Sequence, residues 1–359
     1  SSSTSNNNIV SIQHAIDAHT ARINDFEWSM TNDLIVTVSS DKSAKVWDVH
    51  SGKALRVFRK GLGALACCAF HPLNNNIIVV GGNSCRLHIL NISTGIEQAD
   101  PKYVQDTDPS MKKPFTNAKT PLTSISFSPT VFSQDGVWNL LFVGDNKGCI
   151  HCCQYSLQDN YIYRNAVSKV SGARITSINY RAWYSNQDYT PELLVNALDN
   201  TLRLLALDVR SHTLSLSKAY RLPSKKYTIH SCFCPLISIR DGACIVSGSS
   251  DTCVYLYNVR RSGRSDAPIN ILNGHSAPVI DVSWNYEESL LASGDKDGMV
   301  IIWKRKKSDQ NFATTVSSNS SKLSNSKLSK SSETSKSSET TKPSETSKSS
   351  KSSKSSETS

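Results

Sequence analysis

The chain has 359 residues, of which 40 are Lys or Arg and 30 are Asp or Glu, giving a formal net charge of +10. Twelve of the basic and five of the acidic residues lie between Lys304 and Ser359, so the preceding part carries only +3 and is not a basic nucleic-acid-binding domain by composition. No window reaches the roughly 18 apolar residues of a membrane helix, and the polar start lacks a signal-peptide core. The ten cysteines therefore predict reduced thiols of an intracellular protein.

The first and last parts of this region share a repeated pattern. His19 is followed at 18, 22 and 28 residues by Thr37, Asp41 and Trp47. The same offsets from His275 lead to Ser293, Asp297 and Trp303. Because four residue types recur at identical spacing, the pattern indicates a repeated structural unit rather than a hydrolase triad.

Four weaker copies lie between these two. Each has a first strand that ends in an aromatic residue and then a pair of alternating apolar strands. They are expected at residues 64–92, 122–155, 174–207 and 229–259. In the last of them Ser247, Asp251 and Tyr257 keep part of the spacing, with Tyr in place of Trp. Six units are predicted, and a seventh if a segment upstream of Ser1 supplies it.

These residues resemble the WD-repeat family. The resemblance implies an all-β propeller at residues 18–305, in which each repeat supplies four antiparallel strands. It also implies that His, Ser or Thr, Asp and Trp form a hydrogen-bonded relay, since a buried imidazole needs partners for both nitrogens. Residues 1–17 are expected to be a polar segment whose strand closes the ring by pairing with the last blade. Residues 306–359 are expected to be a disordered tail rich in Ser, Lys, Glu and Thr.

Longer stretches, such as residues 234–251 and 273–293, resemble one nuclear member of this family. That resemblance implies a non-catalytic scaffold in the nucleus, with a cytoplasmic pool, that binds chromatin or transcription regulators. It implies no cofactor and no metal, and a monomeric propeller within a larger complex.

The alternative function is a substrate receptor of a cullin-type ubiquitin ligase. Residues 207–210 read LDVR and residues 257–260 read YNVR. These endings, at Arg210 and Arg260, resemble the W-D-x-R sequence with which some propellers dock onto such ligases. A solvated arginine on the rim is the structural explanation of the same residues.

A cysteine-rich strand is the one candidate metal site. Cys149, His151, Cys152 and Cys153 contain a CxxC spacing. Because side chains alternate between the faces of a strand, Cys149 and Cys152 are expected to point in opposite directions. No metal site is therefore predicted.

An aromatic-rich segment, residues 181–191, is expected to form a loop between the first two strands of a blade. Exposed aromatic side chains there would anchor a partner, or else fold back over the rim. They are Trp183, Tyr184 and Tyr189.

A basic run follows the last predicted strand, where the tail begins. It consists of Lys304, Arg305, Lys306 and Lys307. Such a run fits the simplest nuclear-import signal, while a solvated strand end is the structural alternative. From Lys330 the tail repeats a Ser-rich hexapeptide, and the +7 charge of residues 304–359 predicts weak, salt-sensitive binding to polyanions.

Overall fold

The computed structural model describes residues 12–98, 115, 118–132, 138–158, 160–185, 188–223, 227–235, 244–260 and 267–304. The chain separates into two units, Ser1–Arg305 and Lys306–Ser359. The second unit, with the predicted disordered tail and its polyanion binding, lies outside the described residues. The described residues form strands and turns without α-helix, and accordingly no helix among them has the length and apolarity to cross a membrane.

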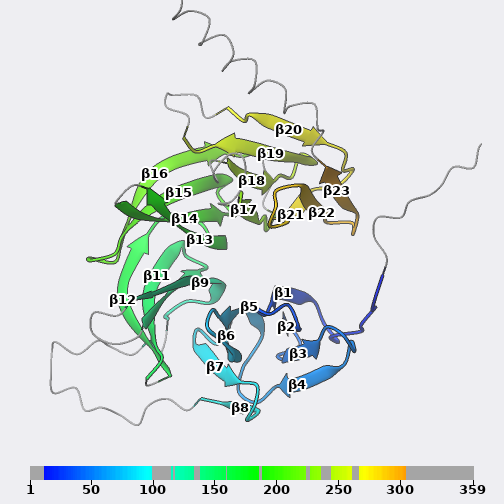
Figure 1. Ribbon diagram of the computed structural model, residues 1–359, viewed down its shortest axis with the longest axis vertical. Coiled ribbons are helices and arrows are strands. Elements are labelled where there is room, and N and C mark those ends of the chain that lie inside the picture. Colours follow the sequence, from blue (N-terminus) through cyan, green and yellow to red (C-terminus); the bar gives the residue numbers. More distant parts are fainter. Residues whose placement is uncertain are drawn as a thin grey trace, which may run out of the picture. The chain divides into compact units, whose positions relative to one another are not determined.

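Six antiparallel sheets follow one another along the first unit, five with four strands and the last with three (Figure 1). The first two sheets contain β1 (Ile23–Trp28), β2 (Leu34–Ser39), β3 (Ala44–Asp48) and β4 (Ala54–Phe58), then β5 (Leu65–His71), β6 (Asn74–Gly82), β7 (Leu87–Asn91) and β8 (Ile96–Glu97). The next two contain β9 (Leu122–Phe132), β10 (Trp138–Asp145), β11 (Cys149–Ser156) and β12 (Tyr161–Lys169), then β13 (Ile175–Ser185), β14 (Asp188–Ala197), β15 (Thr201–Asp208) and β16 (Thr213–Arg221). The last two contain β17 (Ser231–Phe233), β18 (Cys244–Gly248), β19 (Cys253–Asn258) and β20 (Asn270–Asn273), then β21 (Val279–Trp284), β22 (Leu290–Asp295) and β23 (Val300–Lys304).

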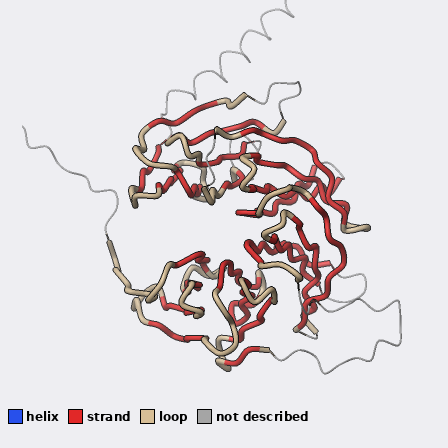
Figure 2. The backbone as a smooth tube through the Cα atoms, turned by 180° about the vertical axis from the view of Figure 1, so that it is seen from behind, coloured by secondary structure: helices blue, strands red, loops and turns tan. Residues whose placement is uncertain are grey.

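This arrangement is a six-bladed β-propeller, and each predicted unit corresponds to one sheet. The first strands of the sheets line a common central cavity of about 540 Å³. Seen from behind, strands make up most of the described chain (Figure 2). Within each sheet, neighbouring strands are antiparallel, as the alternating apolar pattern predicts.

The turns between second and third strands show why particular residues are needed. Between β10 and β11, Oδ1 of Asp145 accepts hydrogen bonds from the backbone N–H groups of Lys147 (2.9 Å) and Cys149 (2.8 Å). Gly148 in this turn has φ 83°, and a Cβ there would lie 2.3 Å from the carbonyl oxygen of Ser171. Only glycine fits this position without displacing the neighbouring backbone.

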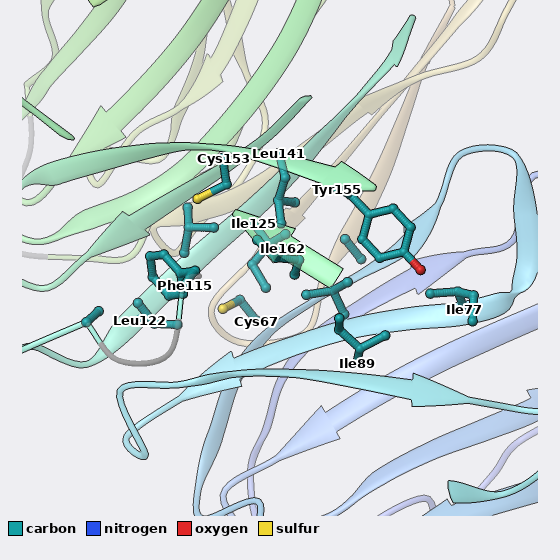
Figure 3. Packing of buried hydrophobic residues seen from close by; sticks show 14 residues of the cluster. Cys67, Ile77, Ile89, Phe115, Leu122, Ile125, Leu141, Cys153, Tyr155 and Ile162 are labelled. Carbon is teal, nitrogen blue, oxygen red and sulfur yellow. The ribbon is translucent and has the colours of Figure 1, made fainter. Parts of the chain in front are cut away.

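The hydrophobic core is divided among the junctions between successive sheets. Between the second and third sheets, residues from β5, β6 and β7 pack against residues from β9, β10, β11 and β12 (Figure 3). Corresponding clusters join the first sheet to the second, the third to the fourth, the fourth to the fifth and the fifth to the sixth. At each of these five junctions, the facing surfaces of two neighbouring sheets are buried against each other.

The structure corrects two expectations about local conformation. Residues 181–185 and 188–191 lie in strands and not in a loop: β13 and β14 pair as a hairpin, in which Trp183 pairs with Thr190 and Tyr184 with Tyr189. Aromatic and β-branched residues favour strands, and here they lengthen the pairing. The predicted loop conformation is therefore wrong at these positions, while a role of Trp183, Tyr184 and Tyr189 in binding a partner stays a prediction.

The N-terminal segment also differs from the expectation. Residues 12–22 form no strand, and the sixth sheet ends at β23 among the described residues. His14 instead donates a hydrogen bond from Nε2 to the carbonyl oxygen of His50, 2.9 Å away, beside the first sheet. Residues 12–17, the described part of the predicted closing segment, therefore form no strand, and residues 1–11 lie outside the described residues.

Candidate protein-interaction site

The relay in the first sheet joins four side chains. His19 contacts Oδ2 of Asp41 through Nδ1 (2.9 Å) and Oγ1 of Thr37 through Nε2 (2.8 Å). Nε1 of Trp47 donates to the same Thr37 oxygen (2.9 Å). Burial alone would raise the pKa of Asp41, but hydrogen bonds from Ser43 and His19 outweigh it and hold that pKa well below its usual range. The relay therefore ties an entry loop, two strands and a turn together.

The relay in the sixth sheet uses a different acid from the predicted Asp297. Nδ1 of His275 contacts Oδ2 of Asp295 at 3.0 Å, while Nε2 contacts Oγ of Ser293 at 2.7 Å. Nε1 of Trp303 donates to that serine oxygen at 2.7 Å. Asp295 follows Ser293 by two residues, so both side chains lie on the same face of β22. Asp297 is exposed in the turn, and the prediction that it forms the relay was wrong.

The partial set in the fifth sheet does not form a relay. Oδ2 of Asp251 accepts a hydrogen bond from the hydroxyl of Tyr255 (2.5 Å), and Oγ of Ser247 pairs with Oγ of Ser231 (3.0 Å). Tyr257 is buried, with its ring 4.6 Å from that of Tyr220. The imidazole of His230 lies toward Asp281 of the sixth sheet, so it does not bridge the serine and the acid.

Two short versions of the relay were not predicted. In the third sheet the hydroxyl of Thr120 donates to Oδ2 of Asp145 (2.8 Å), and in the fourth that of Ser171 donates to Oδ2 of Asp199 (2.8 Å). A hydroxyl thus replaces the imidazole. The hydroxyl residue and the acid are 25 and 28 residues apart in these two pairs, whereas His19 and Asp41 are 22 apart. Because the spacing is not constant, the sequence did not reveal these pairs.

Arg210 and Arg260 occupy the same place in adjacent sheets. Each is exposed and follows the third strand of its sheet, β15 or β19. The backbone N–H of Arg210 donates to Oδ1 of Asp208 (2.9 Å), and that of Arg260 donates to Oδ1 of Asn258 (2.8 Å). Nζ of Lys218 donates to the carbonyl oxygen of Val259, which ties β16 to the next turn. Each arginine thus follows a third strand by two residues, and its backbone N–H is bound by the side chain two residues before it.

Acidic side chains line one part of the central cavity. Enclosure by the surrounding strands raises the pKa of Asp25 to about 6 and that of Glu27 to about 8. Oδ2 of Asp25 accepts from the backbone N–H of Cys68 (3.0 Å), and Oε2 of Glu27 accepts from that of Phe70 (2.6 Å). These acids bind the first sheet to the second.

The remaining candidates are the basic run after β23 and the cysteine-rich strand β11. Lys304 is the exposed last residue of β23, while Arg305, Lys306 and Lys307 lie outside the described residues. Cys152 and Cys153 are buried and Cys149 is half-buried, and burial raises the pKa of each thiol. Within the described ranges, no group of three or more His, Cys, Asp or Glu is placed to hold a metal.

Comparison with known proteins gives the following matches. Residues 10–48 and 266–304 match the family model described as WD domain, G-beta repeat. The Denticleless protein homolog of Danio rerio is 24% identical over 318 residues, covering 84% of this chain and 47% of the relative. The WD repeat-containing protein 26 homolog of Drosophila melanogaster is 26% identical over 317 residues, covering 79% and 46%. The crystal structure of the Myceliophteria thermophila Cps50 (Swd1) β-propeller domain shares 19% identity with a TM-score of 0.58, covering 80% of this chain and 85% of that domain.

Fold and matched repeats together define the class: the first unit is a six-bladed β-propeller in which residues 10–48 and 266–304 match the WD-repeat model. This fold is typically non-catalytic, and WD propellers bind proteins. Within the class, the matches support the WD-repeat family but not the particular resemblance to WD repeat-containing protein 13 that residues 273–293 suggested. The chain spans about half the length of these curated relatives.

Proposed function

We propose that the chain is a substrate receptor of a cullin-type ubiquitin ligase. One observation carries the proposal: Arg210 and Arg260 stand exposed at the same turn of two adjacent sheets. The likeness to the Denticleless protein homologs of Danio rerio and Xenopus laevis favours this function over a chromatin scaffold. No described residue favours chromatin or transcription regulators as partners.

The turn geometry suits docking by a guanidinium group. Arginine offers five N–H donors in a planar fork and no acceptor, so it pairs with carboxylate or carbonyl oxygens of a partner. Asp208 and Asn258 each accept from the arginine backbone, which fixes the start of the side chain and lowers the entropy lost on binding. In this proposal the fourth and fifth sheets face the ligase adaptor and the rest of the propeller remains available for a substrate.

A pull-down from cells tests the docking residues. The double variant Arg210→Ala, Arg260→Ala is expected to recover much less cullin-adaptor subunit than the unchanged chain. Arg59→Ala is the matched control, because Arg59 is also exposed but lies after β4 of the first sheet. Adaptor recovery that is equal for the double variant and the control would contradict the ligase role.

We also propose a nuclear location, with Lys304 and the three basic residues after it as the import signal. Its support is the sequence of the run together with the exposure of Lys304 at the end of β23. An exposed basic segment that emerges from a folded edge is accessible to an import receptor.

A further inference from the structure

Basic side chains are concentrated at one end of the first three sheets. Because neighbouring strands are antiparallel, the turn between the second and third strands lies at the same end of a sheet as the connection into the next sheet. Six described stretches form this end: residues 40–43, 59–64, 83–86, 118–121, 146–148 and 169–174. Together they contain eight basic residues and a single acid, Asp41.

The opposite end of the first two sheets is close to neutral. Its turns and connections are residues 29–33, 49–53, 72–73 and 92–95. They contain one acid, Asp33, and one base, Lys53. The positive charge is therefore placed at one end of the strands, and the total of +3 for the part before Lys304 does not reveal this separation.

One basic residue from each of the six stretches defines what we call the basic arc: Lys42, Lys60, Arg86, Lys119, Lys147 and Lys169. Arg86 is half-buried and the five lysines are exposed. None of these lysines forms an ion pair with a described residue. Their charges are therefore not balanced by an acid within the described part of the chain.

Hydrogen bonds join the stretches of the basic arc to one another. The side-chain amide of Asn24 donates both to Oγ of Ser40 and to the carbonyl oxygen of Leu65, and so links the first two stretches. Backbone N–H groups bind carbonyl oxygens of the neighbouring stretch at 2.7–3.0 Å in the remaining cases: Asn83 to Ala64, Ala118 to Cys85, Asn146 to Pro121 and Val170 to Gly148. The basic side chains are therefore carried on one continuous surface.

The acids next to the arc are directed inward and serve the turns. The carboxylate of Asp41 contacts the ring of His19 at 2.9 Å, whereas Lys42, the next residue, is exposed. In the third sheet Asp145 is 3% exposed and accepts backbone N–H groups of its own turn, whereas Lys147 is exposed. Each turn thus uses its acid for structure and leaves its base at the surface.

The composition of the six stretches indicates the kind of partner. They contain no aromatic residue, so they provide no platform on which the bases of a single-stranded nucleic acid could stack. Five of their eight basic residues are lysines, which act as separate point charges and not as the bidentate forks with which arginines bind phosphate. Because the charges are spread over three sheets, an extended chain with several carboxylates can pair with them in succession, which one small anion cannot do.

We propose that the basic arc binds an acidic segment of a partner polypeptide, one rich in Asp and Glu. Exposed charge pairs are individually weak and are screened by salt, so the affinity comes from several pairs at once and falls as salt rises. Arg210 and Arg260 follow third strands, at the other end of their sheets. The basic arc is therefore separate from the proposed ligase docking, and either proposal can fail alone.

Fluorescence anisotropy of the full chain with a labelled peptide of alternating Glu and Gly tests the basic arc. The arc variant carries Lys42→Gln, Lys60→Gln, Lys119→Gln and Lys147→Gln. The matched control removes the same charge from the other unit of the chain, with Lys322→Gln, Lys327→Gln, Lys330→Gln and Lys336→Gln. The arc variant is expected to bind the peptide roughly tenfold or more weakly than the unchanged chain, and the control within about twofold of it. The Kd of the unchanged chain should rise between about 50 mM and about 500 mM salt.

A third variant, in which the same four lysines of the arc become arginine, keeps the charge and is expected to bind like the unchanged chain. It separates loss of charge from loss of fold, and failure of this variant to bind would overturn recognition by charge. Equal weakening in the arc variant and the control, or no binding by the unchanged chain at low salt, also overturns the proposal. So does tighter binding of a DNA duplex, or of a phosphoserine peptide of the same length and charge, with the same loss in the arc variant, because the arc would then be a site for phosphate groups.

Discussion

At the scale of single residues, the acid of each relay is the aspartate whose carboxylate lies within hydrogen-bond distance of the histidine. It is not always the aspartate at the fixed spacing from that histidine. In the first sheet that acid is Asp41, and in the sixth it is Asp295. Burial would raise the pKa of Asp295, but bonds from His275 and from the backbone N–H groups of Met299 and Asp297 lower it. The sequence spacing identified the histidine, the hydroxyl residue and the tryptophan of the sixth relay. It could not decide between Asp295 and Asp297, which are two residues apart.

The variant Asp295→Ala is expected to lower the melting temperature by several degrees, because it leaves the imidazole of buried His275 without its Nδ1 partner. Asp297→Ala is expected to have almost no effect, since its side chain is exposed. Thermal unfolding followed by circular dichroism measures both. A larger loss for Asp297→Ala would show that the sixth relay uses that residue.

Glu27 predicts a specific pH dependence. Its pKa is raised to about 8 from the ordinary 4.5, so between these values the folded chain keeps a proton that the unfolded chain has lost. The contribution of Glu27 to stability then falls as pH rises from about 4.5 to 8 and is constant above that range. Glu27→Gln should remove this fall, so that its urea midpoint gains on the unchanged chain from pH 5 to pH 8. Parallel midpoints across that range would place the pKa of Glu27 near its ordinary value.

At the scale of elements, sequence patterns predicted strands well and their lengths poorly. The apolar alternation located all six sheets, but it ended the hairpin of β13 and β14 too early because Ser185, Asn186 and Gln187 resemble loop residues. Strand pairing extended through the neighbouring aromatic residues instead. The described residues 12–17 of the predicted closing segment form no strand. His14 instead donates a hydrogen bond to the carbonyl oxygen of His50, a contact that no periodicity encodes.

The turn between β10 and β11 gives a test at this scale. Gly148 and Gly61 both have positive φ, but only Gly148 lies against backbone, whereas nothing lies within 4 Å of a Cβ at Gly61. Gly61→Ala is expected to cost about 1 kcal/mol of unfolding free energy from its backbone conformation. Gly148→Ala is expected to cost clearly more, since the turn must also move away from Ser171. Urea denaturation measures both, and equal losses would show that the turn is not tightly packed.

The basic run after β23 gives a second test. Replacing Lys304 and the three residues that follow it with Ala is expected to move a fluorescent fusion of the full chain from the nucleus to the cytoplasm. The control variant replaces Lys322, Lys327 and Lys330 with Ala. It removes three positive charges from the tail, nearly as many as the first variant, but leaves the basic run intact. Cytoplasmic residence of the unchanged chain, or unchanged nuclear residence of the first variant, would rule out this import signal.

At the scale of the whole molecule, the sequence predicted the class of fold and the number of blades because the repeat recurs in every sheet. It did not predict that the apolar side chains of Ile23 and Val300 are exposed, since exposure depends on which residues pack beside them. Partner identity is also not encoded in the repeat, whose residues serve packing and turns. The proposed function therefore depends on surface residues, above all on Arg210 and Arg260 in the fourth and fifth sheets.

Binding to a purified cullin-adaptor subunit is the most direct test of that function. Titration calorimetry of the full chain should give a measurable Kd, and the double variant Arg210→Ala, Arg260→Ala should weaken it by roughly tenfold or more, as loss of anchoring arginines does at other interfaces. Arg59→Ala should leave the Kd unchanged, and all three proteins should melt at the same temperature. Equal affinity of the double variant and the unchanged chain, or no binding by the unchanged chain, would contradict the role of substrate receptor.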